Sequence, residues 1–114
     1  MTEDLTCAQR SLLRATQLLW AASQTDIDVD LATNLPEVLL QSAVRMLVWQ
    51  AATLLPDGLP LEGAQPAQPG LLAALEEAET HLRARPIWEY PGGTTDLVID
   101  ICDAIARTRA RAWL

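Results

Sequence analysis

The sequence has few of the residues that carry catalytic or metal chemistry. Its 114 residues contain one histidine, two cysteines, one tyrosine and no lysine or phenylalanine. Two cysteines cannot form a disulfide framework and fit a reducing cytoplasm, and one histidine without a Cys-x-x-Cys motif leaves zinc without a ligand set. No apolar run reaches the roughly 18 residues of a membrane span, and the start Met1-Thr2-Glu3-Asp4 lacks the basic residues of a secretory signal. We therefore expect a cytoplasmic protein.

Positive charge is also scarce. Eight arginines stand against fifteen acidic residues, which gives a net charge of −7. An acidic surface repels the phosphates of nucleic acids and of anionic lipids, so we expect no nucleic-acid partner and no membrane partner. The length, with a hydrophobic content of 50%, predicts one globular domain that spans residues 1–114.

Apolar residues recur at helical spacing in four stretches. We predict helices over residues 3–23, 35–55, 71–85 and 95–113. Thr2 and Asn34 are the expected N-caps of the first two helices. Between the second and third helices, residues 56–70 contain four prolines and three glycines and are expected to form a loop. Short helices joined by loops predict an all-α, antiparallel four-helix bundle.

The predicted second helix carries apolar side chains around more than half of its circumference. A surface helix needs an apolar stripe of only about 100°. This helix therefore either lies in the centre of the bundle or buries a second face against another chain.

Two pairs of carboxylates have a spacing of three residues, at Glu76 and Glu79 and at Asp100 and Asp103. Residues three apart share one face of a helix, so two such pairs on neighbouring helices can hold magnesium. The spacing resembles that of the all-α nucleoside-triphosphate pyrophosphohydrolases, whose bundles carry Glu-x-x-Glu and Glu-x-x-Asp. That resemblance implies Mg²⁺-dependent hydrolysis of a nucleoside triphosphate at these four residues, although Asp100 stands where the family has glutamate.

The same charges also fit a solvent-exposed surface. Acids in the first turn of a helix and arginines in its last turn are favoured by the helix dipole. Asp103 with Arg107, and Glu79 with Arg83, have the i,i+4 spacing of ordinary helix ion pairs. This interpretation accounts for the charges without a ligand.

An acidic stretch between the first two predicted helices matches part of an EF-hand calcium loop. Oxygen-bearing side chains occupy loop positions 1, 3, 5, 9 and 12, which are Asp26, Asp28, Asp30, Asn34 and Glu37. Leu31 stands where the loop requires glycine for its sharp turn, and Pro36 also departs from the pattern. The alternative is an extended connection whose aspartates face water.

Aromatic residues supply the remaining candidate site. Trp20 and Trp49 lie on the polar sides of the two longest predicted helices, near Leu13 and Arg45, and Trp88 lies in a predicted loop. Tryptophan and arginine anchor many protein interfaces. We therefore expect a contact module of accessory, regulatory or inhibitor type, without intrinsic catalysis or a cofactor, that meets a protein partner or forms a homodimer. The alternative is that the proline-rich loop folds over the rings and completes the core.

Overall fold

The fold is described by a computed structural model. It describes residues 5–24, 31–56, 58–62, 65, 67 and 70–112, with the side chains of residues 31–37 and 111–112 left aside. Its helices are α1 (Cys7–Ser23), α2 (Leu31–Ala52), α3 (Leu71–Arg83) and α4 (Thr94–Ala112), with a 3₁₀ turn, η1 (Ile87–Glu89), between the last two. No strand occurs within these ranges. The predicted all-α class is therefore confirmed.

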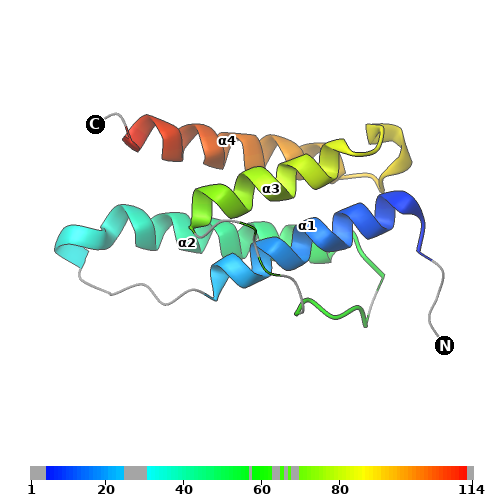
Figure 1. Ribbon diagram of the computed structural model, residues 1–114, viewed down its shortest axis with the longest axis horizontal. Coiled ribbons are helices and arrows are strands. Elements are labelled where there is room, and N and C mark those ends of the chain that lie inside the picture. Colours follow the sequence, from blue (N-terminus) through cyan, green and yellow to red (C-terminus); the bar gives the residue numbers. More distant parts are fainter. Residues whose placement is uncertain are drawn as a thin grey trace.

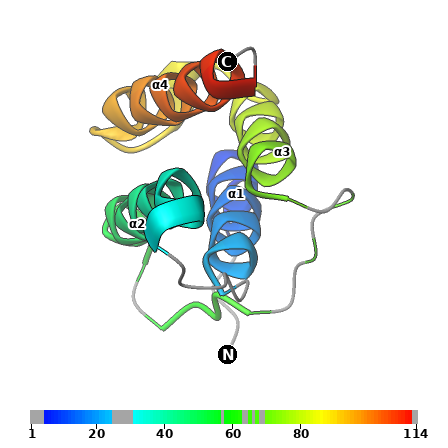
Figure 2. The same cartoon turned by 90° about the vertical axis from the view of Figure 1, so that its left-hand side faces the viewer.

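Helix α1 is deeply buried. It packs against both α2 and α3, and α4 packs against the same two helices (Figures 1 and 2). Leu12, Leu18 and Leu19 of α1 have no exposed surface. Only Cys7 and Arg10 of this helix are classed as exposed. Each of the four helices packs mainly against two others, so the second helix does not occupy a central position in the bundle.

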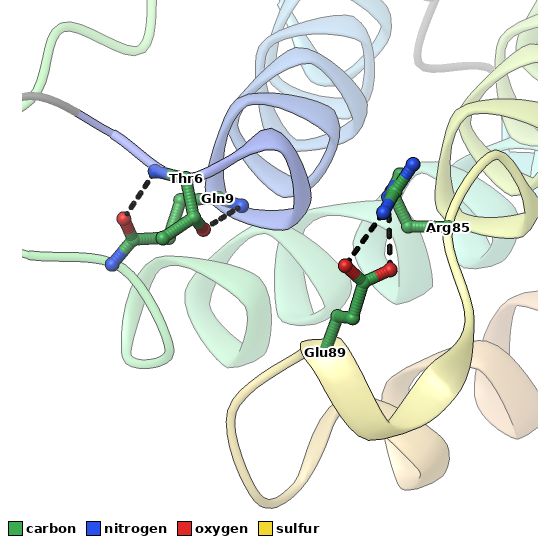
Figure 3. Close-up of polar contacts among 4 residues, drawn as sticks. All are labelled: Thr6, Gln9, Arg85 and Glu89. Carbon is green, nitrogen blue, oxygen red and sulfur yellow. Dashed lines mark hydrogen bonds and ion pairs between the residues drawn. The ribbon is translucent and has the colours of Figure 1, made fainter.

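The start of α1 is fixed by a capping box (Figure 3). The Thr6 hydroxyl accepts a hydrogen bond from the Gln9 backbone N–H at 3.0 Å, and the Gln9 side-chain oxygen accepts one from the Thr6 N–H at 2.9 Å. Two backbone donors that a helix end leaves unpaired are satisfied in this way. The predicted start at residue 3 is therefore wrong, and Thr2, its expected cap, lies outside the described residues.

The other helix ends differ from the prediction by a few residues. Helix α2 already includes Leu31, so the prediction of Asn34 as its N-cap is wrong; leucine and alanine before Asn34 are good helix formers and do not stop the helix. Helix α3 ends at Arg83 instead of residue 85. The reason is Pro86, whose ring disfavours the helical conformation at the residue before it.

The capping box gives a first prediction. Replacing Thr6 by alanine removes the acceptor for the Gln9 N–H and is expected to lower the free energy of unfolding by about 1 kcal/mol. Urea unfolding followed by circular dichroism measures this loss. The matched control is Thr2→Ala: if that variant lost the stability and Thr6→Ala did not, the helix would begin where the sequence pattern placed it.

The burial of α1 gives a second prediction. Leu12 is fully buried, whereas the adjacent Leu13 is only partly buried against the same core. Leu12→Ala is expected to lower the free energy of unfolding by about 3 kcal/mol because it leaves a cavity, and Leu13→Ala by about 1 kcal/mol. Denaturant unfolding of the two variants tests the order; equal losses would contradict the difference in burial between these two side chains.

Candidate functional site

The two carboxylate pairs do not come together. Glu79 forms an ion pair with Arg83 of its own helix, and Glu76 lies 3.4 Å from Arg109, which joins α3 to α4. Asp100 and Asp103 are exposed and line a hollow between α4 and α2 instead. In the described part of the chain, no three histidine, cysteine, aspartate or glutamate side chains are grouped so that they could hold a metal ion. The geometry thus gives the magnesium alternative no support.

The calcium-loop residues fall largely on a part of the chain that is not described. Asp26, Asp28 and Asp30 lie outside the described residues. Asn34 and Glu37 lie in the N-terminal part of α2, and their side chains are also outside the description. The calcium hypothesis therefore stays a prediction.

The predicted contact residues divide into two groups. Leu13 and Trp20 are partly buried and pack against the core. They share a face of α1 with Gln17, whose side-chain amide donates a hydrogen bond to the Pro60 carbonyl at 3.0 Å. The chain around Pro60 therefore lies over this face, as the core-completing alternative expected. Leu13 and Trp20 are not part of an exposed patch.

Arg45, Trp49 and Trp88 are exposed, as a contact surface requires. The exposed fraction is 74% for Trp49 and 82% for Trp88. Trp49 belongs to a group of exposed apolar side chains on α2 that the sequence analysis did not identify. Met46 and Leu39 of the same helix are also exposed, by 73% and 53%.

We call Leu39, Met46 and Trp49 the α2 stripe. Their spacing of seven and three residues places them on one side of the helix, opposite Val44 and Ala51, which are completely buried. The over-wide apolar arc of the sequence was the signal for this surface. The sequence left two interpretations of this arc. The exposure of the α2 stripe excludes a central position for the helix in the bundle, and a second apolar face that contacts another chain stays a prediction.

The α2 stripe borders a groove between α2 and α4. Two adjoining hollows of about 200 Å³ and about 280 Å³ form it. Its walls are Leu39, Leu40, Ala43, Met46, Leu47 and Gln50 of α2, and Asp100, Asp103, Ala104, Arg107 and Thr108 of α4. The α2 wall is mainly apolar, and the charges stand on α4. Such a surface can bury hydrophobic area and select a partner by charge at the same time.

Trp88 is presented by a braced turn at a second place on the surface. Both side-chain oxygens of Glu89 accept hydrogen bonds from Arg85, at 2.9 and 2.6 Å, across the break at Pro86 (Figure 3). This paired hydrogen bond, reinforced by the opposite charge, raises the pKa of the Arg85 guanidinium. Tyr90 follows η1 and is buried, which raises the pKa of its phenol. The turn is therefore held at both ends while the indole points to solvent.

None of the described helices combines the length and apolarity needed to cross a lipid bilayer. The two cysteines are both free: Cys7 is exposed and Cys102 is partly buried.

The two groups of tryptophans predict different fluorescence. Chains that keep only Trp49 or only Trp88, with the other tryptophans changed to phenylalanine, are expected to emit at long wavelength and to be quenched strongly by acrylamide. A chain that keeps only Trp20 should emit at shorter wavelength and resist quenching, because its ring packs against the core. Equal quenching of the three indoles, measured at low protein concentration, would contradict this division.

Comparison with known proteins adds no assignment to these surfaces. No protein-family profile, no curated protein and no solved structure matches the chain.

Proposed function

We propose that the chain acts by contact with another protein surface, as an accessory, regulatory or inhibitor-type module, and that the α2 stripe is the centre of that contact. The observation that carries the proposal is the exposure of Leu39, Met46 and Trp49 on one side of one helix. Single exposed apolar residues are common on protein surfaces, but a contiguous group is typical of a binding site.

The energetics support the same surface. Burying a large apolar side chain contributes roughly 1.5–3 kcal/mol, so the three residues together can supply a substantial part of a binding free energy. Methionine and tryptophan are enriched in protein interfaces, and methionine adapts its shape to a partner. Arg45, one helical turn before Trp49, adds a positive charge at the rim.

We also infer that the four helices form an antiparallel bundle, which gives the contact surface a rigid frame. Support comes from the opposite chain directions of α1 and α2, and of α3 and α4, in Figure 1. The free cysteines suit a reducing cytoplasm as the place of action. The net charge of −7 favours a protein partner over nucleic acid or an anionic membrane.

Site-specific cross-linking in the native cells tests the proposal. Met46 is replaced by a photo-reactive p-benzoylphenylalanine, and illumination is expected to join the chain covalently to the protein that covers the α2 stripe. Thr80 is the matched control position, because it is exposed on α3, whose main packing partners are α1 and α4.

Adducts from position 46 that are absent from position 80 support the proposal, and mass spectrometry identifies the joined protein. If position 46 gives no adduct, or both positions give the same adducts, the α2 stripe is not a specific contact surface and the proposal fails.

A further inference from the structure

The charges on α4 are ordered along one stripe. Asp96, Asp100, Asp103 and Arg107 are all exposed and follow one another at spacings of four, three and four residues, which keeps them on one side of the helix. Three of them, Asp100, Asp103 and Arg107, line the groove beside the α2 stripe. The acids thus stand in the first half of α4, and the basic charge stands in the second half.

These groove charges have no partner within the described structure. The side chains of Asp100, Asp103 and Arg107 take part in none of its hydrogen bonds or ion pairs, so the i,i+4 pair expected between Asp103 and Arg107 is not formed. Asp100 and Arg107 are seven residues apart, which is about 10.5 Å along the helix, so they cannot pair within one copy. Charges of both signs therefore point into the groove unpaired.

A stripe with acids at one end and a basic residue at the other is complementary to itself when a second copy runs in the opposite direction. If Asp100 lies opposite Arg107 of a second α4, the two-fold axis places Arg107 opposite the second copy's Asp100. Each symmetric contact thus forms twice.

From this complementarity we infer that the groove binds a second copy of the chain, with the two α4 helices antiparallel across a two-fold axis and Leu39 and Met46 of both copies buried beside them. The inference rests on the proposed contact function and names its partner. A basic helix from another protein would neutralise Asp100 and Asp103 but would place like charge against Arg107. A second copy places an opposite charge against both Asp100 and Arg107.

The net charge of the chain does not prevent this association. At physiological ionic strength the Debye length is about 8 Å, so distant charges on two copies are largely screened. The charges that meet in the groove therefore determine whether electrostatics favours the dimer. The charge of Asp103 opposes the dimer. In this register Asp103 lies next to the two-fold axis and approaches Asp103 of the second copy, and like charges repel. Removing that charge should therefore tighten the dimer.

Charge exchange between two variants tests the inference. Sedimentation velocity over a range of concentrations is expected to show a dimer for the unmodified chain. Asp100→Arg and Arg107→Asp each place like charges opposite one another twice, and each is expected to weaken self-association on the order of 30-fold or more. An equal mixture of the two variants restores opposite charges at both contacts, so a heterodimer should form with nearly the affinity of the unmodified dimer.

Two further variants complete the test. Asp103→Asn is expected to strengthen the dimer several-fold, whereas a basic partner helix would lose affinity to the same variant. Glu62→Arg is the control, since this exposed acid lies outside the groove and should leave association unchanged. Circular dichroism and thermal unfolding establish that all variants are folded.

The outcomes separate the inference from the proposed function. A chain that stays monomeric at every concentration, or a dimer that withstands both single charge reversals, overturns the inferred two-fold contact. Cross-linking of position 46 to a different protein would then still support the contact function. Failure of the mixed variants to associate, when each alone is folded, also overturns the inferred pairing.

Discussion

The packing of α1 is the constraint on which the rest of the molecule depends. Three of its leucines have no exposed surface, and α2, α3 and the chain around Pro60 each cover part of it. A helix enclosed in this way must be apolar on several faces, and α1 meets that demand with leucine, alanine and a partly buried tryptophan. The threonine and serine inside it, Thr16 and Ser23, bond to carbonyl groups one turn earlier and so bring no unpaired polar group into the core.

The position of α1 explains the surface of α2. Because α2 packs on α1 with one side and on α4 with another, the bundle uses only part of its apolar circumference. Leu39, Met46 and Trp49 remain outside. The same arrangement directs one side of α4 to α3, through Glu76 and Arg109, and the other to the groove. The charge of α4 that forms an ion pair within the bundle and the charges of α4 that are unpaired thus lie on two different sides of this helix.

The sequence predicted the helices well and their ends less well. Periodicity identifies α1 to α4 because each buries a regular stripe, but Thr2 and Thr6 are equally good caps by residue type. Only the reach of Gln9 to Thr6 decides between them. Arg85 has helix-forming character, yet Pro86 and the bond to Glu89 remove it from α3.

The proposed contact surface was predictable in part. The exposure of Trp49 and Trp88 agrees with the predicted contact role. Leu13 and Trp20 are instead partly buried, because a helical wheel cannot include a loop that returns over the polar side. Met46 and Leu39 belong to the wide apolar arc of α2, and a single sequence does not show which residues of that arc are buried and which are exposed. The division depends on which sides of α2 the other helices cover, and that is a property of the whole chain.

The contact between α1 and α3 is the most extensive in the molecule, and it joins segments separated by α2 and by the proline-rich connection. Closing so long a loop has an entropic cost that is met only when the final packing forms. A local hairpin of α1 and α2 therefore leaves much of α1 uncovered during folding. Chains whose main contacts are distant in sequence fold more slowly than those built from neighbours. On the ribosome, the enclosure of α1 must wait until α3 has been synthesised.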